Sequence, residues 1–263
     1  LRSRLLRRLL GPNAVGIVWR TWNGELSLPP GDMVIARTLA RQGAWDRASI
    51  EHLLTLIDGN SRVLVVGAHV GSVVVPLAAR AREVVAYEAN PANFEHLQLN
   101  LRINGCHNVD ARNRAASNAP GRLKMLANTT NTGSSKLRPA HLSYAYVYDA
   151  PPEIEVPAVV LDDDITDHGF DLVVMDIEGS ECLAMQGMRS ILQRCRALQI
   201  EYLPQLMHDV AGADDAQFPS MIASQFDTAH IAEDRQRFGR DGFGQLLARA
   251  REVGGADLVF TKA

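Results

Sequence analysis

The stretch RVLVVGAHVGSVVVPLAARAREVVAYE, residues 62–88, constrains the fold of this chain more than any other. A short apolar run at 63–66 leads into the turn GAHVG at 67–71, then into a segment of helical period and a second apolar run that stops at Glu88. Short apolar runs bounded by turn residues are typical of buried parallel strands. The stretch therefore predicts a strand, a tight turn, a helix and a second strand.

This unit predicts an adenosine-type ligand. In a parallel sheet the binding crevice lies at the carboxyl ends of the strands, and the turn after the first strand opens onto it. Gly67 and Gly71 leave room for the backbone to approach a ligand, and a helix starting near Gly71 points unpaired N–H groups at the same space. Glu88, at the end of the second strand, can accept hydrogen bonds from both hydroxyls of a ribose. The alternative is an ordinary strand-to-helix turn with a solvent-exposed Glu88.

The composition fits one globular domain. The chain has 263 residues, enough for one α/β domain with a full core, and its 46% hydrophobic and 22% charged residues are ordinary values. The net charge of -3 argues against a nucleic-acid partner, which usually requires a basic surplus. Because no apolar run is long enough to span a bilayer, we expect no stable membrane insertion. The odd number of cysteines lacks metal-type spacing and indicates reduced thiols in a cytoplasmic protein.

The N-terminal sequence LRSRLLRRLL, residues 1–10, is basic and rich in leucine. A helix that packs on the domain, a surface helix that touches a membrane or a partner, and a targeting segment all fit it. We favour the packing helix, because positive charge alone anchors a helix only weakly to a membrane. The sequence leaves open whether the chain forms a homo-oligomer.

The segment before the first strand predicts a small cap. Residues 14–30 alternate apolar and polar side chains around an Asn-Gly pair, a strong hairpin signal. Asp32 can cap a helix, and a second helical pattern covers 46–57. We therefore divide the chain into an N-terminal helical and hairpin cap, residues 1–58, and a ligand-binding domain, residues 59–263.

Strand and helix patterns alternate along the rest of the chain. A helix opens at Pro91, and the other expected elements are strands at 109–115, 170–176, 197–203 and 256–262 and helices at 180–194, 216–225 and 244–253. This alternation predicts an α/β fold with one doubly wound parallel sheet.

Residues 116–160 and 233–242 show no regular pattern and are expected to be loops. A loop as long as the first is more often functional than idle. Its residues Tyr144, Tyr146 and Tyr148 allow two interpretations. They form a wall or lid for the ring of an acceptor molecule, or they form the face of an irregular strand, because a period of two is also a strand signal.

Acidic residues stand at the ends of three predicted strands: Glu88, Asp176 and Glu201. Glu178 and Glu181 follow Asp176 in the sequence DIEGSE, where they can instead start a helix, because acidic groups stabilise a helix N-terminus. Carboxylates that face one crevice repel one another and need a cation, either a positively charged ligand or a divalent metal. A metal between Asp176 and Glu201 fits by position, but no ligand spacing is diagnostic, and we predict no resident metal.

S-adenosylmethionine meets both requirements, because it carries cationic sulfonium and ammonium groups as well as a ribose for Glu88. NAD is the main competitor. Against NAD, the turn reads G-x-x-x-G rather than G-x-G-x-x-G, and the chain has no Tyr-x-x-x-Lys pair of the kind that short-chain dehydrogenases use. A Walker loop is excluded because no Gly-Lys-Ser/Thr occurs.

Five motifs can be considered together. They are VGAHVG at 66–71, YEANPANFEHLQLNLRINGCHNV at 87–109, NTGSS at 131–135, MDIEGSECLAMQGM at 175–188 and IEYLP at 200–204. This combination resembles the FkbM family of S-adenosylmethionine-dependent methyltransferases. The resemblance implies the Rossmann-like class I methyltransferase sheet, seven strands with the last antiparallel. It also implies O-methylation of a hydroxyl on a sugar, a polyketide or another secondary metabolite.

Three positions depart from the family pattern. The family commonly has Asp two residues before the first glycine and Lys two residues before the motif aspartate, where this chain has Val65 and Val174. Because the two strands are expected neighbours, an apolar pair replaces a buried ion pair, a change that is often neutral or stabilising. His69 stands where the family usually has Asn. It can contact the cofactor, cap the helix or act as a base, and we favour the first two roles over the third.

The predicted reaction is transfer of the sulfonium methyl group to an oxygen of a small hydroxylated acceptor, accelerated by holding the two reactants in line. The residues expected to bind the cofactor are Gly67, Ala68, His69, Val70, Gly71, Glu88, Ala89, Asn90, Asn113, Arg114, Ala115 and Asp176. The candidates for catalysis are Asp176, Glu178, Glu181 and His208, with Glu201 as a further base. Two other functions stay open: a nucleotide-dependent oxidoreductase, and a non-catalytic member that binds the cofactor or a partner enzyme.

Overall fold

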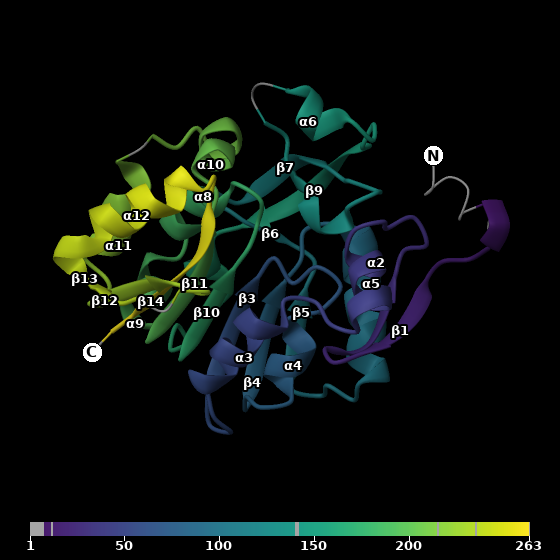
Figure 1. Cartoon of the computed structure of the whole chain (residues 1–263), viewed down its shortest axis with the longest axis horizontal. Helices are drawn as coiled ribbons and strands as arrows, with labels where there is room; N and C mark the ends of the chain where they lie inside the picture. Colours follow the sequence, from purple (N-terminus) through teal and green to yellow (C-terminus); the bar gives the residue numbers. More distant parts are fainter. Residues whose placement is uncertain (1–7, 12, 140–141, 215, 235, 263) are drawn as a thin grey trace.

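The computed structural model of the protein describes residues 8–11, 13–139, 142–214, 216–234 and 236–262. An eight-stranded sheet runs through the molecule in the order β13-β12-β14-β11-β10-β3-β4-β5 (Figure 1). Its strands are β3 (Arg62–Val66), β4 (Glu83–Tyr87), β5 (Val109–Arg112), β10 (Leu172–Met175), β11 (Ala197–Tyr202), β12 (Thr228–Ile231), β13 (Phe238–Gly239) and β14 (Ala256–Thr261).

The directions of the strands confirm the predicted sheet. β5, β4, β3, β10 and β11 pair in parallel, and β14 is antiparallel to both of its neighbours, β11 and β12. This is the expected doubly wound sheet whose last strand is antiparallel. The sequence patterns miss β12, which is short and of mixed polarity, and the two-residue edge strand β13, which lies in the predicted loop at 233–242.

Helices cover both faces of this sheet. They are α2 (Ile35–Gln42), α3 (Arg47–Thr55), α4 (Val74–Ala78), α5 (Pro91–Ile103), α8 (Glu181–Gln186), α9 (Arg189–Arg194), α10 (Pro204–Ala211), α11 (Gln217–Ala223) and α12 (Phe243–Glu252). Side chains alternate along β3, so that Val63 and Val65 pack in a core with α2 to α5, whereas Leu64 and Val66 pack in a second core with α8 to α12. The site-forming ends of the strands are therefore held between two hydrophobic layers.

The N-terminal hairpin packs against one of these layers. β1 (Ile17–Thr21) and β2 (Gly24–Leu28) pair antiparallel across the predicted turn, and Asp32 accepts backbone hydrogen bonds at the start of α2, as expected of a cap. Apolar side chains of β2 share a hydrophobic core with β3 and α5. The domain boundary at residue 58 remains a prediction. The predicted helix at 1–10 falls largely outside the described residues.

Part of the segment 116–160 forms a second sheet, so the prediction of an irregular loop throughout is wrong. The strands β6 (Ala115–Ala116), β9 (Glu153–Val159), β7 (Gly121–Leu126) and β8 (Lys136–Leu137) lie in that order. β6 is parallel to β9, and the other pairs are antiparallel. The strand expected at 109–115 therefore ends with β5, because the chain passes from the first sheet into the second. β7 and β9 do alternate charged and apolar side chains, a strand signal that the sequence-based prediction missed.

The tyrosine-rich segment forms a single helical turn, α6 (Tyr144–Val147). The interpretation of its tyrosines as a strand face is therefore wrong. The Tyr146 hydroxyl donates a hydrogen bond to Asp209 on α10, whereas Tyr144 and Tyr148 are exposed. The segment thus links the second sheet to α10, the helix that follows β11 of the central sheet.

Two helices differ from their predicted extents. α4 begins three residues after Gly71, because Gly71 has a φ of 95°, outside the helical region. The helix predicted at 180–194 is divided into α8 and α9 around Gly187. A Cβ atom at Gly187 would lie 2.1 Å from the carbonyl oxygen of Ser117, so close approach of the β6 segment accompanies this break.

The two strand positions that depart from the family pattern face each other. Val65 in β3 and Val174 in β10 are register partners, with 1% and 6% of their surfaces exposed. They form the buried apolar pair that the sequence predicts.

The described part of the chain contains no helix that is both long and apolar enough to cross a membrane. Cys106, Cys182 and Cys195 carry free thiols.

Candidate functional site

A cavity of about 190 Å³ that opens to solvent lies at the carboxyl ends of β3, β4 and β10. Concave cavities with a few convergent polar groups are the usual sites for small molecules, so this cavity is the candidate ligand site. The turns that follow these strands line it, together with residues 131–137, which lead into β8. The central sheet and the second sheet therefore both contribute to the cavity.

The sequence-predicted residues divide into two groups. Those that line the cavity are Gly67, Ala68, His69, Glu88, Ala89, Arg114, Ala115, Asp176 and Glu178. Those outside its lining are Val70, Gly71, Asn90, Asn113, Glu181 and His208. None of the three predicted wall tyrosines lines it.

The turn after β3 requires glycine at its first position. Gly67 has a φ of 93°, and a Cβ atom there would lie 1.7 Å from the carbonyl oxygen of Asp176. The N–H groups of Gly67 and Ala68 both donate to the carbonyl oxygen of Tyr87 at 2.9 Å. The turn is thereby fixed between β4 and β10, with its backbone against the cavity.

Glu88 is buried at the end of β4, so the alternative of a solvent-exposed strand end is wrong. Only 6% of its surface is exposed, and its carboxylate accepts hydrogen bonds from the N–H groups of His69 at 2.7 Å and Asn90 at 2.8 Å. Burial is the largest cause that raises the pKa of Glu88 to about 7. The Asn113 side chain donates to the carbonyl oxygens of Glu88 and Ala89. Asn90 and Asn113 therefore support Glu88 from outside the cavity.

His69 is held through both its backbone and its ring. Its φ of 49° lies in the left-handed region, which histidine visits more often than most non-glycine residues. Its Nε2 lies 2.9 Å from the Thr132 hydroxyl, which in turn donates to Asp32 Oδ2 at 2.7 Å. Burial, opposed in part by the charge of Asp32, lowers the pKa of His69 to about 4. The imidazole is therefore neutral at neutral pH.

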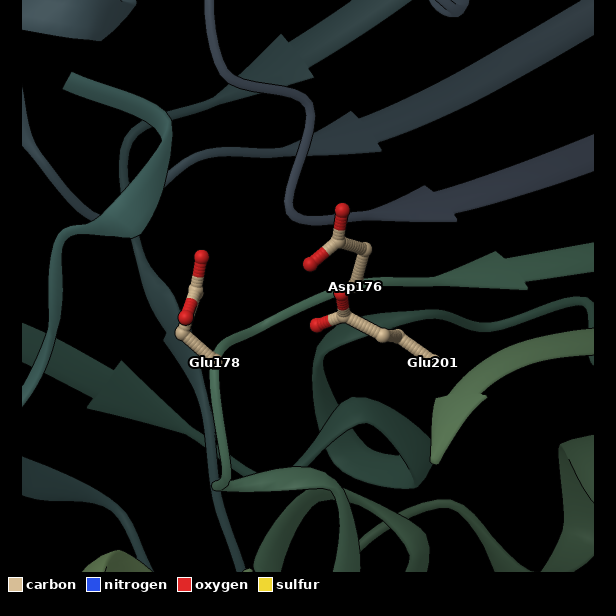
Figure 2. Close-up of side chains that lie close together, drawn as sticks. All are labelled: Asp176, Glu178 and Glu201. Carbon is tan, nitrogen blue, oxygen red and sulfur yellow. The ribbon is translucent and has the colours of Figure 1, made fainter. Parts of the chain in front are cut away.

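Three carboxylates meet at the cavity (Figure 2). Asp176 and Glu178 lie on the turn after β10 and Glu201 lies on β11, with one oxygen of each within 4.8 Å of the others. Asp176 and Glu201 are hydrogen-bonded to each other, which requires a proton between them. Burial and the charge of Asp176 raise the pKa of Glu201, so we place this proton on Glu201. Burial raises the pKa of Asp176 as well, opposed by its hydrogen bond to Glu201. Because Asp176 is the more exposed of the two and lines the cavity, we place the negative charge of the pair on it.

Lys136 offsets the charge of Glu178. This lysine is only 5% exposed, and its Nζ lies 3.8 Å from Glu178 Oε2. Glu178 has a φ of 55°, a strained conformation of the kind that concentrates at functional sites. Burial raises the pKa of Glu178 to about 7, against the opposite effect of Lys136.

Glu181 shapes the turn that leads into α8. It is 1% exposed, and its Oε1 accepts hydrogen bonds from the N–H groups of Ile177 at 3.1 Å and Gly179 at 3.2 Å. Burial raises the pKa of Glu181 to about 8. These contacts give it a structural role in the turn that carries Asp176 and Glu178.

His208, a candidate for catalysis, lies on α10 and does not line the cavity. Its Nδ1 lies 3.3 Å from the carbonyl oxygen of Ala213, near the end of the same helix. The sequence signal for α10 is Pro204, which occupies the first helical position.

Some residues at or next to the cavity escape the sequence patterns. They are Asp32, Trp45, Met125, Thr132, Ser135 and Lys136. The NTGSS motif at 131–135 is the signal that points to two of them, because Thr132 and Ser135 belong to it. Asp32 and Lys136 reach the site only through the folding of distant segments.

The charges of the cluster favour a cationic ligand over a metal. With Glu201 protonated and Glu178 paired with Lys136, one negative charge remains, on Asp176. Three carboxylate oxygens at this spacing are close enough for a divalent ion. A ligand with a single net positive charge balances the cluster better than a divalent metal does.

The family is established by sequence comparison. The family model of the Methyltransferase FkbM domain matches residues 66–223, more than half of the chain. The chain belongs to this family. No curated protein sequence matches the chain.

Several solved structures resemble this chain. The methyltransferase FkbM from Methylobacillus flagellatus KT has 18% sequence identity and a TM-score of 0.49, and the match covers 85% of this chain and 57% of that chain. A transferase from Pyrococcus horikoshii, PH0793, has 11% identity and a TM-score of 0.50, with 98% and 80% covered. TYW2 from M. jannaschii, solved in complex with AdoMet, has 12% identity and a TM-score of 0.45, with 95% and 87% covered. This chain thus spans just over half the length of the first relative, and at these identities the likeness concerns the fold alone.

Membership of the Methyltransferase FkbM family makes S-adenosylmethionine the expected cofactor. The residues present fit this cofactor. Gly67 lines the cavity but needs to be glycine because of the Asp176 carbonyl rather than a ligand, Glu88 lies at the expected ribose position, and the charge on Asp176 complements a cation.

Proposed function

We propose that this methyltransferase methylates a hydroxyl oxygen of a small molecule, such as a sugar or a polyketide. The observation that carries the proposal is the cluster of Asp176, Glu178 and Glu201 at the cavity. An alcohol must lose a proton when its oxygen is methylated, and a carboxylate in the cavity can receive it. The same negative charge stabilises the cationic methyl donor.

S-adenosylmethionine supplies the electrophilic methyl group. As the acceptor oxygen takes this methyl group and S-adenosylhomocysteine leaves, a carboxylate oxygen of Asp176 or Glu178 would receive the hydroxyl proton. Lys136 orients Glu178 from behind, and Glu201 orients Asp176 through their shared proton. Most of the acceleration comes from holding the two reactants in line.

The charge of the protein supports a small acceptor over a nucleic acid. The chain has a net charge of -3, and carboxylates line the cavity where the acceptor enters. Phosphate backbones bind to surplus Lys and Arg and are repelled by carboxylates. RNA methyltransferases occur among the proteins of similar fold, so transfer to RNA is the outcome to test against.

The test is a methyl-transfer assay with labelled S-adenosylmethionine and a panel of sugars, polyketides, amines and transfer RNA. We expect label in hydroxylated small molecules only, with a product methyl resonance typical of an O–CH₃ group. Asp176→Asn should lower kcat about 100-fold or more, because it removes the only uncompensated charge of the cluster. The exposed control Glu155→Gln should leave kcat unchanged.

Label in amines or RNA would overturn the proposal of O-methylation. Cofactor binding without transfer to any member of a broad hydroxylated panel would favour the non-catalytic alternative. The oxidoreductase alternative predicts binding of NAD in place of S-adenosylmethionine, which family membership opposes.

A further inference from the structure

The protein holds the His69 ring in one orientation through two residues from other segments. Thr132, from the segment before β8, lies next to the ring, and Asp32, from the segment before α2, lies next to Thr132. The backbone N–H of His69 is bound separately, to Glu88 at 2.7 Å. A strained left-handed residue with both ends fixed is a feature that functional sites retain at a cost in stability.

The hydrogen bonds to Asp32 show which ring nitrogen of His69 carries its proton. Asp32 is 3% exposed and accepts from four donors: the N–H groups of Val34, Ala36 and Thr132, and the hydroxyl of Thr132. A carboxylate with four donors is ionised and can only accept. The Thr132 hydroxyl therefore gives its one proton to Asp32 and must accept from His69 Nε2. Nε2 carries the proton, and Nδ1 carries the lone pair.

Nδ1 is the free face of this ring. Among the residues that the structure describes, none forms a hydrogen bond with Nδ1, and the imidazole lines the cavity. The ring is neutral at neutral pH because burial lowers the pKa of His69 to about 4. A neutral ring whose Nδ1 lone pair is unpaired can accept from an N–H or O–H donor, and unlike a protonated ring it does not repel a cation.

We propose that His69 Nδ1 accepts a hydrogen bond from the ammonium group of the cofactor, and that Thr132 and Asp32 are positioning residues that fix the ring for this contact. The proposal rests on S-adenosylmethionine as the cofactor and is independent of the acceptor. Three features favour the ammonium group over other donors. His69 lies in the turn after β3, its neutrality suits a cationic partner, and hydrogen bonds to charged donors are about twice as strong as neutral ones.

The chain offers two substitutions that separate the ring nitrogens. The amide nitrogen of Gln in His69→Gln takes the place of Nε2 and can still donate to Thr132, but nothing replaces Nδ1. The shorter side chain in His69→Asn places a polar atom near Nδ1, and Asn tolerates the left-handed conformation of this position. The two variants therefore test the lone pair of Nδ1 separately from the hydrogen bond between Nε2 and Thr132.

The experiment is titration calorimetry with S-adenosylhomocysteine and with its analogue that lacks the amino group. In the wild type, loss of the amino group should weaken binding by about tenfold or more. In His69→Gln, S-adenosylhomocysteine should bind about tenfold more weakly, whereas the analogue should bind as it does to the wild type. The ratio of the two dissociation constants should thus fall close to one, with His69→Asn keeping part of the ratio.

A ratio that stays at its wild-type value in His69→Gln would overturn the proposal, and so would a wild type that does not distinguish the two ligands. The first result would leave His69 as a structural residue or as a contact of the acceptor. The calorimetry contains no acceptor, so its result does not depend on whether the enzyme methylates an oxygen.

The positioning role of Thr132 has its own readout. Nitrogen-15 spectra of histidine-labelled protein should show His69 protonated at Nε2 alone. Thr132→Val removes the hydroxyl while keeping the shape of the side chain, so it should mix the tautomers and lower the dissociation-constant ratio. Thr132→Ser keeps the hydroxyl and should restore both the single tautomer of His69 and the wild-type ratio of dissociation constants. A proton on Nδ1 in the wild type, or an unchanged ratio in Thr132→Val, would contradict the role given to Thr132.

Discussion

At the scale of single residues, the site depends on where the backbone allows no side chain. Gly67 combines a φ of 93° with a carbonyl oxygen of Asp176 at 1.7 Å from the position of a Cβ atom. A methyl group there displaces either the turn or the strand end that carries Asp176. The same residue therefore controls the positions of two turns that line the cavity, the turn after β3 and the turn after β10.

We expect Gly67→Ala to lower the free energy of unfolding by roughly 2 kcal/mol or more and to abolish binding of S-adenosylhomocysteine. Urea denaturation and titration calorimetry measure the two effects. Gly244→Ala is the matched control, because its Cβ meets no atom within 4 Å and alanine is favoured in a helix such as α12. Full binding in Gly67→Ala would show that the turn relaxes around the methyl group.

The charges of Asp176, Glu178 and Glu201 predict that methyl transfer needs no divalent metal. Lys136 compensates Glu178, and the proton on Glu201 leaves one negative charge for the cationic cofactor. Turnover after treatment with EDTA should equal that of the untreated enzyme. Added Mg²⁺ or Mn²⁺ should not raise it. Loss of turnover that returns with one of these ions would instead identify the cluster as a metal site.

At the scale of elements, β3 and β10 show how a buried charge pair can be replaced. Val65 and Val174 are register partners with almost no exposed surface, at the positions where the family commonly has Asp and Lys. One charge alone in this place has no partner and cannot reach water, whereas two opposite charges compensate each other.

We expect Val65→Asp and Val174→Lys each to lower the free energy of unfolding by about 3–5 kcal/mol, and the double variant to recover most of this loss. Urea denaturation of the wild type, the two single variants and the double variant measures the coupling. Additive losses in the double variant would contradict the assignment of these positions as an exchangeable pair.

Local sequence patterns predict the central sheet well, because its strands are short apolar runs that carry their own signal. The residues at their carboxyl ends, Glu88 and Asp176 among them, follow from the same patterns. The break at Gly187 and the second sheet do not, because both depend on tertiary contacts: the carbonyl of Ser117 against Gly187, and strand pairings across residues 116–159.

The candidate site shows the same division. The turn at 67–71 and the DIEGSE motif are local, and the sequence places most of their residues at the cavity. Asp32 and Thr132 are 100 residues apart and meet only in the fold. Thr132 fixes the His69 ring, and Lys136 compensates the charge of Glu178. Both partners come from the second sheet region, for which the sequence predicts only a loop.

At the scale of the whole molecule, acidic side chains accumulate at one end of the central sheet. Asp257, at the start of β14, interacts with the charges of Asp176, Asp46 and Glu233. Burial first and these charges second raise the pKa of Asp257 to about 7. Grouping negative charges at the site therefore also lowers the stability of the fold.

This grouping predicts a stability that falls as pH rises. Below the pKa of the unfolded chain, about 4, Asp257 is protonated in both states and carries no penalty. Between about pH 4 and pH 7 the folded state keeps its proton while the unfolded state releases it, so the unfolding free energy decreases with pH and levels off above pH 7.

Asp257→Asn removes this term and should raise Tm by about 2–4 °C at pH 8, with a difference that shrinks toward pH 4. Asp163→Asn, which replaces an exposed residue, is the control. Thermal melts of this variant at each pH should show no such trend. An Asp257→Asn difference that is constant from pH 4 to pH 8 would mean that Asp257 titrates normally and that the acidic end of the sheet is more accessible to water than its packing indicates.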